Sequence, residues 1–249
     1  MILFESGLFA IPQLLTAVGL SAAFALVAWG MRSVTAGAAF TGFLLTILLC
    51  AAAGPGALLP ILTVFLLTIL STRVGRRKKE RLGTAERCRG RNTLQILANV
   101  GVASLCAAPL VYAFHARYLL LAGSSAALAE AAGDTVSSEL GQALGGHPRL
   151  ITTFRRVAIG QDGGITLAGT ICSLVAIAAV CLSCEYCHML LPQFYWIVFA
   201  AAFFGTIIDS LLGATLERPG MLGNNAVNFT GTASAAAAAI LVLFLQRWR

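Results

Sequence analysis

The chain has 249 residues, of which 58% are hydrophobic and 11% are charged, and its mean hydropathy is +0.86. A soluble domain carries about 25% charged residues, so this composition excludes an ordinary soluble protein and predicts a chain that lives in lipid. The formal net charge is +7, and the positions of the basic residues carry more information than this total.

Uncharged apolar runs recur along the chain, and several approach the roughly 20 residues that span a hydrocarbon core. They predict an all-α polytopic transmembrane bundle of about eight spans: Leu8–Trp29, Val34–Ala53, Pro55–Ser71, Thr93–Phe114, Tyr118–Ala132, Ile165–Ser183, Leu190–Ile208 and Asn228–Leu245. We expect residues 1–249 to form a single integral-membrane domain. The N-terminus has no basic region and carries Glu5, so we expect no cleavable secretory signal.

Basic residues gather between the third and fourth predicted spans, in a loop of residues 72–92. Loops rich in Lys and Arg stay on the cytoplasmic side of a membrane. With eight spans, the loops 133–163 and 209–227 fall on the same side. The prediction is a multi-pass protein of a bacterial inner membrane with its active face in the cytoplasm. The basic loop either sets topology and attracts anionic lipid, or some of its cations face an anionic substrate.

Polar residues interrupt the apolar pattern near that side. Asn92, Gln95 and Asn99 are spaced as one stripe of a helix. Lipid offers amides no hydrogen-bond partner, so this stripe must face polar groups or water. Asp209 ends the seventh predicted span, and Glu217 follows after two four-residue steps. An ionisable residue at a membrane edge is a candidate for function.

These polar groups come from distant segments yet fall on one predicted face of the membrane. Independent caps or solvated edges would be scattered over both faces. Hard oxygen ligands beside a cationic loop suit Mg²⁺ and phosphate. The sequence therefore predicts a site for phosphoryl chemistry, formed by Asp134, Ser138, Glu139, Asp209, Glu217, Asn92, Asn99 and Asn225.

Five strings occur in the order TRVGRRK (72–78), RNTLQILAN (91–99), GDTVSSELG (133–141), DSLLGATLE (209–217) and NNAVNF (224–229). They resemble an integral-membrane family that includes the phytyl-phosphate kinase of tocopherol synthesis. The resemblance implies a kinase that transfers the γ-phosphate of a nucleotide, with CTP as the expected donor, to an isoprenyl monophosphate. Phytyl or geranylgeranyl phosphate would become the diphosphate. The segment 149–164 departs from the family pattern, since VAIGQDGG replaces a Pro-rich turn.

A phosphate oxygen is already anionic, so catalysis of this transfer is positioning and charge neutralisation. We assign Asp134 and Asp209 to Mg²⁺, with Glu139 and Glu217 as further ligands. Phosphate contacts are expected from Arg73, Arg76, Lys78, Arg91 and Arg149, of which Arg91 is counted as catalytic.

Further contacts to substrate or nucleotide are expected from Asn92, Gln95, Asn99, Ser137, Ser138, Asn224, Asn225 and Asn228. Glycines would allow a close approach of the backbone at Gly133, Gly141, Gly163 and Gly164. The chain has no P-loop string. The expected partners are membrane lipid, the isoprenyl monophosphate and the nucleotide; nucleic acid is not expected, and the oligomeric state is left open.

Two other functions stay open. A kinase that acts on the free polyprenol or phytol alcohol would need a base, for which Asp134 or Asp209 could serve. A transporter or flippase for an anionic lipid tends to carry internal repeats and midplane binding groups. The chain shows no convincing repeat and gathers its acids at one edge, which favours an enzyme.

The string Cys184-Glu185-Tyr186-Cys187-His188 has the Cys-x-x-Cys-His spacing of c-type haem attachment. With Cys181, these residues could also form a zinc site. The string stands alone on a short turn, and the family resemblance does not include it. A structural role is the favoured interpretation, with a disulfide or redox role left open.

Overall fold

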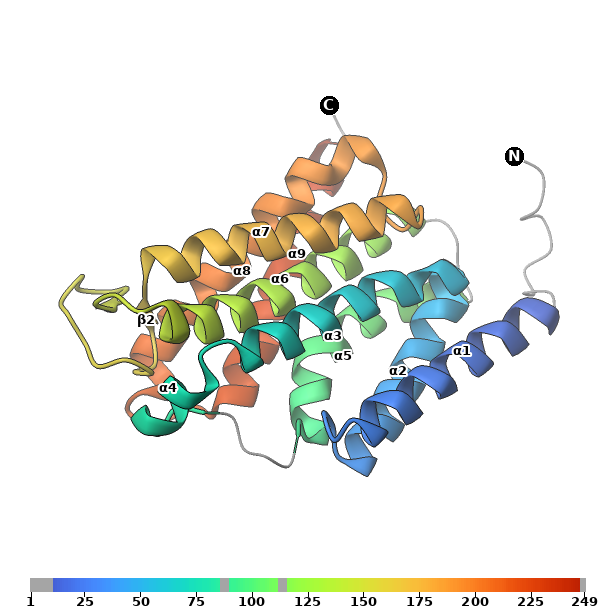
Figure 1. Cartoon of the computed structure of the whole chain (residues 1–249). Helices are drawn as coiled ribbons and strands as arrows, with labels where there is room; N and C mark the ends of the chain where they lie inside the picture. The colour runs from blue at the N-terminus through green and yellow to red at the C-terminus, as the bar shows by residue number, and fades with distance from the viewer. Residues whose placement is uncertain (1–10, 86–89, 112–115, 247–249) are drawn as a thin grey trace.

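The computed structural model describes residues 11–85, 90–111 and 116–246. In these ranges eight long helices follow one another (Figure 1): α1 (Ile11–Gly30), α2 (Ala36–Ala53), α3 (Leu58–Arg73), α5 (Thr93–Ala107), α6 (Arg117–Leu144), α7 (Leu167–Tyr186), α8 (Tyr195–Leu212) and α9 (Asn224–Gln246). Six segments of the described chain are long and apolar enough to cross a membrane. The predicted all-α polytopic bundle is therefore confirmed.

Short elements connect the long helices. Three single turns of 3-10 helix precede or follow long helices, at Pro55–Ala57, Ala108–Val111 and Pro192–Phe194, and a π-helical turn, η4 (Gly213–Glu217), extends α8. The helix α4 (Arg76–Leu82) lies within the basic loop. Two strands of two residues each, β1 (Arg149–Leu150) and β2 (Gly164–Ile165), pair antiparallel.

Helix α6 runs through the centre of the bundle, where α3, α5, α7, α8 and α9 pack around it (Figure 1). Every residue from Leu121 to Gly133 is buried, and most of them are Ala, Gly or Ser. Small side chains let membrane helices approach closely. An added Cβ at Gly123 or Gly133 would lie 2.7 Å from a side-chain carbon of Ile240 or Ile177.

Helix α6 also corrects a predicted boundary. The fifth span was expected to end at Ala132 and a loop to fill 133–163, but the helix continues to Leu144. The polar residues after Ala132 show that the helix leaves the most apolar part of the bundle, but they do not end it. Helix α7 still packs along this part of α6. At Gly141, an added Cβ would lie 2.9 Å from Thr166 Oγ1.

The predicted loop 209–227 is shorter than expected for the same reason. Helix α8 continues past Ile208 to Leu212, and η4 extends it to Glu217. Helix α9 begins at Asn224 rather than Asn228. The loop that remains comprises residues 218–223.

Four connections meet at one end of the bundle: residues 31–35, 74–92, 145–166 and 213–223, of which 86–89 lie outside the described residues. We call this the basic end. Arg91 N donates to Ser33 O at 2.9 Å, and Lys78 Nζ donates to Ala143 O at 3.1 Å. Gly163 packs against Ala214 of η4. These connections therefore lie at one end of the bundle, and their location on the cytoplasmic side of a membrane stays a prediction.

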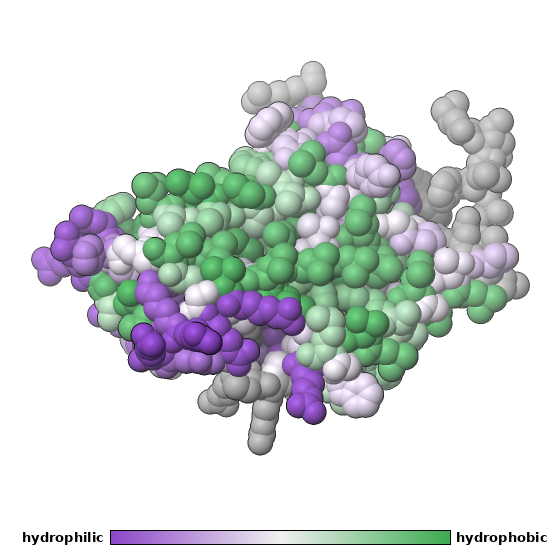
Figure 2. Space-filling model, in the orientation of Figure 1, coloured by the Kyte–Doolittle hydropathy of each residue, from purple (hydrophilic) through white to green (hydrophobic). Residues whose placement is uncertain are grey.

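Hydrophilic and apolar side chains occupy different parts of the molecular surface. Figure 2 shows hydrophilic residues gathered at the basic end, over α4 and the segment around β2, and a broad apolar band across the middle of this face. A band of this kind suits a hydrocarbon environment, whereas the hydrophilic end suits the membrane surface.

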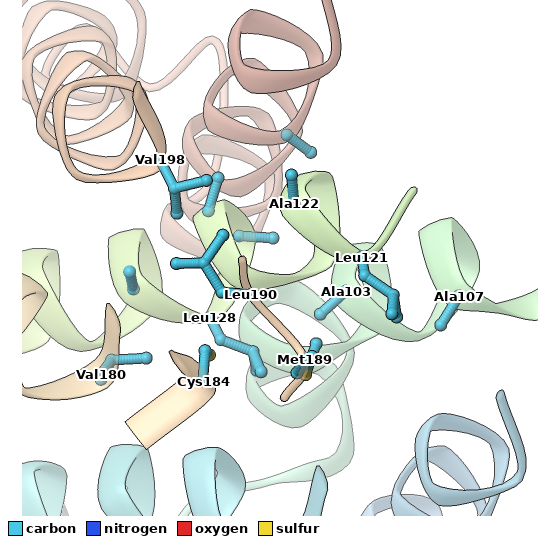
Figure 3. Close-up of a cluster of buried hydrophobic side chains, with 14 of the residues drawn as sticks. Ala103, Ala107, Leu121, Ala122, Leu128, Val180, Cys184, Met189, Leu190 and Val198 are labelled. Atoms are coloured by element: carbon cyan, nitrogen blue, oxygen red, sulfur yellow. The ribbon is translucent and has the colours of Figure 1, made fainter. Parts of the chain in front are cut away.

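The cysteines of the Cys-x-x-Cys-His string lie mostly in the apolar core. Cys181 and Cys184 are fully buried, and Figure 3 shows Cys184 beside Leu128. Burial raises the pKa of the Cys187 thiol, which makes it a weak nucleophile. Within the described chain the cysteines are free, and no three side chains from His, Cys, Asp and Glu are grouped to hold a metal. These observations favour the structural interpretation.

A buried ion pair fastens α4 to the bundle. Lys79 is only 1% exposed and pairs with Glu139 of α6. Its Nζ also donates to Ser71 O at 3.2 Å and to Thr72 O at 2.8 Å, at the C-terminal end of α3. One cation therefore ties together α3, α4 and α6.

Replacing Lys79 should weaken the fold strongly. In Lys79→Met the carboxylate of Glu139 loses its cation, and breaking a buried pair costs about 3–5 kcal/mol. The exposed pair Arg76–Glu80 offers a matched control, since Glu80→Ala should change stability by less than about 1 kcal/mol. Thermal unfolding in detergent measures both. Equal stabilities of the two variants would contradict the fastening role, and adding Glu139→Leu to Lys79→Met should recover part of the loss.

Candidate functional site

Two carboxylates from distant segments lie against each other inside the bundle, near the basic end. Asp134 is on α6 and Asp209 is near the end of α8, and their carboxyl groups are within hydrogen-bonding reach. Asp209 is 9% exposed and its Oδ2 has no hydrogen-bond partner, whereas Asp134 is partly exposed. Two adjacent buried carboxylates repel each other, and a cation relieves that repulsion. The structure thus brings together the two acids that were assigned to Mg²⁺.

A third acid, Glu130, lies one helical turn before Asp134 and is 1% exposed. Two glycines of neighbouring helices make room for it. An added Cβ at Gly205 of α8 would lie 2.6 Å from Glu130 Cγ, and one at Gly231 of α9 would lie 2.5 Å from Glu130 Oε1. The Oε1 atom has no hydrogen-bond partner.

Glu130 was not among the predicted site residues. It stands within an alanine-rich run that was interpreted as part of a span. The signal that identifies it is the four-residue spacing from Asp134, which places both acids on one face of the same helix. An acid within a membrane helix is rare enough to indicate a function.

Arg91 places a cation beside the carboxylate pair, close enough to act on the charge of Asp134. Its backbone is fixed to the start of α2, since its N–H donates to Ser33 O and its carbonyl accepts from Thr35 N at 3.0 Å. Gly90 makes this approach possible. It has a φ of 75°, and an added Cβ would lie 2.7 Å from Arg32 O.

Glu217 lies at the rim of the acidic cluster. Its side chain is hydrogen-bonded to Asn224, and its charge acts on that of Asp209. The π-helical turn that carries Glu217 is contacted by Gly163. This turn brings the loop residue Asp162 into electrostatic range of Glu217.

The four predicted metal ligands do not all converge. Glu139 points to Lys79 and forms its ion pair there. Within the described chain, no three groups from His, Cys, Asp and Glu stand close enough to hold one metal ion. The pair Asp134 and Asp209 fits Mg²⁺, which binds through one or two carboxylates and keeps positions for water and substrate phosphate. The unpartnered Oδ2 of Asp209 is an oxygen atom suited to such a ligand set.

The predicted amide stripe has mainly local hydrogen bonds. Asn92 and Gln95 form a capping box at the start of α5, with the Asn92 side chain accepting from Gln95 N at 3.1 Å. Asn99 is buried and donates to Gln95 O at 2.8 Å. Asn99 also lines the cavity described below, so it stays close to the predicted site.

The serines and glycines of the motifs pack mostly against the protein itself. Ser137 lies against Gly169 of α7, and Ser138 is exposed. The close approaches predicted at four glycines are to neighbouring segments: Gly133 to Ile177, Gly141 to Thr166, Gly163 to Ala214, and Gly164 to Gln161.

The asparagines at the start of α9 differ in their surroundings. Asn224 is bonded to Glu217, and Asn225 is partly exposed. The Oδ1 atom of Asn228 is buried without a hydrogen-bond partner. Asn228, on the helix that packs against α8, thus adds an unpartnered oxygen to those of Glu130 and Asp209.

Among the predicted phosphate contacts, Lys78 and Arg149 make hydrogen bonds to the backbone. Lys78 donates to the end of α6, and Arg149 donates to Phe154 O at 2.8 Å. Arg76 pairs with Glu80 at 2.9 Å. Arg73 and Arg76 lie at the mouth of a cavity that also reaches Arg91.

This cavity has a volume of about 220 Å³ and lies between α1, α2, α3 and α5, with Ala131 and Thr135 of α6 at its inner wall. Its walls are largely apolar. Charged and amide side chains enter it at the basic end: Arg32, Arg73, Arg76, Arg91 and Asn99. The cavity thus passes directly beside the part of α6 that carries Asp134.

Comparison with known proteins gives the chain a family. The family described as "Integral membrane protein DUF92" matches residues 19–236. This chain belongs to that family. The match confirms the family expected from the five strings, and it makes the chain an integral multi-pass membrane protein. No solved structure matches it.

Relatives in the DUF92 family come from an archaeon, a cyanobacterium and a plant. The chain is 34% identical to an uncharacterised membrane protein of Methanocaldococcus jannaschii, over 74% of this chain and 75% of the relative. It is 34% identical to Protein PGR of Arabidopsis thaliana, over 84% and 80% of the two chains. It is 28% identical to the chloroplast Protein VTE6 of the same plant, over 83% and 65%.

The glycine slot for Glu130 can be tested directly. Gly231→Ala should displace the carboxyl groups of Glu130 and Asp209, since the new Cβ would lie 2.5 Å from Glu130 Oε1 and 3.3 Å from Asp209 Oδ2. Such overpacking costs about 1–3 kcal/mol. Gly101→Ala is the control, because that buried helical glycine has nothing within 4 Å of an added Cβ. Thermal unfolding in detergent measures the stability of both variants. A Gly231→Ala protein as stable as the original chain would refute the tight fit around Glu130.

Proposed function

We propose that this protein is a membrane kinase that transfers the γ-phosphate of a nucleotide, CTP in the first instance, to an isoprenyl monophosphate and yields the diphosphate. Two findings support the proposal. The chain belongs to the DUF92 family and is related to Protein VTE6, which represents the phytyl-phosphate kinase among its relatives. The described residues also form a polar site of the kind that phosphoryl transfer needs.

The observation that carries the proposal is the position of Arg91. Its side chain lines the apolar cavity and also acts on Asp134 of the carboxylate pair. An anionic head group bound by the arginines of the cavity would therefore lie next to Asp134 and Asp209. A lipid phosphate and a metal-bound nucleotide would meet there.

The chain's own residues would supply positioning and charge. An oxygen of the isoprenyl phosphate attacks the γ-phosphorus, the bond from that phosphorus to the β-γ bridging oxygen breaks, and the nucleoside diphosphate leaves with the electron pair. Arg91 would hold the acceptor phosphate and offset the negative charge that gathers during transfer. Because the attacking oxygen is already anionic, no base has to remove a proton.

Asp134 and Asp209 are the residues that would hold Mg²⁺. When bound, this ion neutralises charge on the nucleotide phosphates and orients them. Glu130 lies one helical turn before Asp134, and it packs between Gly205 and Gly231 of the neighbouring helices. Glu217 and Asn228 stand at the side of the pair where the nucleotide would arrive.

The direct test uses the purified protein in detergent with γ-labelled CTP and Mg²⁺. Phytyl, geranylgeranyl and farnesyl monophosphate are offered beside the matching alcohols, and the label is followed into lipid products. Label in the diphosphates supports the proposal. Label only in the monophosphates would assign the protein as an alcohol kinase. Folded protein that transfers nothing from CTP or ATP would remove the kinase proposal and favour transport.

Charge-removing substitutions at the pair test the site. Asp134→Asn and Asp209→Asn keep the volume of each side chain and should lower turnover by at least about 10²–10³-fold, the usual loss for one electrostatic contact to a transition state. Glu185→Gln is the matched control. Glu185 lies in the last turn of α7, away from the basic end, so this variant should leave turnover unchanged. Initial rates at saturating substrate measure the effect.

Full activity in both aspartate variants would eliminate the metal assignment while leaving the lipid kinase possible. A folded state is checked by size-exclusion profile and by thermal unfolding, so that loss of activity is not confused with loss of structure.

A further inference from the structure

The cavity between α1, α2, α3 and α5 has the form of a seat for one long chain with an anionic head. Its middle and far walls are made of aliphatic and aromatic side chains, among them Phe43, Ile61, Val64 and Ile69. Its volume of about 220 Å³ exceeds the roughly 150 Å³ of an apolar cavity that binds benzene. Water gains few hydrogen bonds from such walls, so an apolar occupant is favoured.

The head of the occupant is defined by charge. Four arginines line the cavity, and they do so at its basic end: Arg32, Arg73, Arg76 and Arg91. Guanidinium groups bind phosphate oxygens in bidentate geometry. No acidic side chain lines the cavity within the described chain, so the arginines set the charge of its lining.

The length of the seat follows from the helix that borders it. On α3 the lining runs from Ile61 to Arg73. Twelve residues of α-helix rise about 18 Å at 1.5 Å per residue. A chain that reaches from the arginines to Ile61 would therefore lie along α3 through more than half the thickness of a hydrocarbon core, which is about 30 Å.

One side of the cavity is bordered by an aromatic contact between α1 and α3. Phe24 of α1 and Phe65 of α3 meet edge to face, with ring centroids 4.9 Å apart, and both rings line the cavity. Helix α1 packs mainly on α2 and lies at the edge of the bundle (Figure 1). The seam between α1 and α3 is therefore the side on which a lipid chain reaches the cavity from the membrane with the least disruption of packing.

We propose that this cavity binds the hydrocarbon tail of a single-chain lipid phosphate, with the phosphate on its four arginines, the tail along α3, and the Phe24–Phe65 seam as its lateral opening. The identity of the ligand as an isoprenyl monophosphate rests on the proposed function. The inference adds the place of the tail and the residues that limit its length, with Ile61 and Thr46 at the far end.

A cavity-filling substitution tests the seat. Gly42 of α2 lines the cavity, and an added Cβ there would meet only Ile96 Cγ2, at 3.8 Å. Gly42→Leu therefore places a new side chain in the tail's path without a backbone clash. The matched control is Gly19→Leu on the neighbouring α1, where nothing lies within 4 Å of an added Cβ and where the cavity does not reach.

Binding is measured without nucleotide, using tritiated geranylgeranyl phosphate and the purified protein in nanodiscs. Gly42→Leu should weaken binding at least about tenfold, whereas Gly19→Leu should stay within about twofold of the original chain. Geranyl phosphate, with its shorter tail, should lose less affinity in Gly42→Leu than the longer ligand. Unlabelled phosphatidic acid, which has two chains, and inorganic phosphate should compete poorly.

A second measurement covers the case in which Gly42→Leu does not fold. A geranylgeranyl phosphate with a diazirine at the tail end is activated on the original chain, and the labelled peptides are identified by mass spectrometry. Label on α2 or α3 between Gly42 and Ile61 supports the seat. Label confined to α7, α8 or α9, or equal affinity in a folded Gly42→Leu protein, would overturn it.

These outcomes are separable from those of the kinase proposal, because binding and labelling need neither nucleotide nor turnover. Tail binding in the cavity without any transfer of phosphate would keep the seat and remove the kinase. Transfer of phosphate by a Gly42→Leu protein with unchanged lipid affinity would keep the kinase and remove the seat.

Discussion

The burial of charged side chains in α6 is the constraint on which the rest of the structure depends. An acid in an apolar bundle is costly unless polar or cationic groups surround it. The alanines, glycines and serines of α6 let five helices come close enough to enclose Glu130 and Asp134. Gly205 and Gly231 serve the same end from the opposite side. The glycine-rich packing and the acidic cluster are therefore two aspects of one arrangement.

Arg91 lies between the helices that enclose the cavity and the helices that surround the acids. Helices α1, α2, α3 and α5 enclose an apolar cavity, whereas α6, α8 and α9 hold the acids. Arg91 precedes α5 and is tied by backbone hydrogen bonds to the turn before α2. A change in the position of α1 and α2 thus moves the cation that faces Asp134. This coupling suits the proposed reaction, in which a lipid phosphate and a water-soluble nucleotide would occupy separate compartments and only the reacting groups would meet.

Much of the architecture could be predicted from the sequence because a helix that spans a hydrocarbon core needs about 20 mostly apolar residues. The number of long helices, the common side of the four connections, and the convergence of Asp134 with Asp209 all followed from hydropathy, charge and order along the chain. Helix ends were predicted poorly at Ala132 and Ile208, because polarity reports the surroundings of a residue and not its backbone conformation. The partners of Glu139 and Lys78 depend on how α4 folds back, which the pattern of a basic loop does not specify. Glu130 was not predicted as a site residue, because it stands in an alanine-rich run that was interpreted as part of a span. Only its four-residue spacing from Asp134 indicated that the two acids share a helix face.

The composition of α6 has a consequence for how the protein is made. Helix α6 carries three acids, Glu130, Asp134 and Glu139, and does not reach the hydropathy of the six segments that qualify as spans in the described chain. An acid at the centre of a helix costs about 2.5–3.5 kcal/mol when a segment partitions alone into the bilayer. The cations beside two of these acids, Lys79 at Glu139 and Arg91 near Asp134, precede α6 in the chain. The glycines that enclose Glu130 are on α8 and α9, which leave the ribosome later. The close packing around Glu130 is therefore complete only when the C-terminal third of the chain has been made, and truncation before α8 should leave Glu130 facing lipid in a product that the cell's membrane quality control removes.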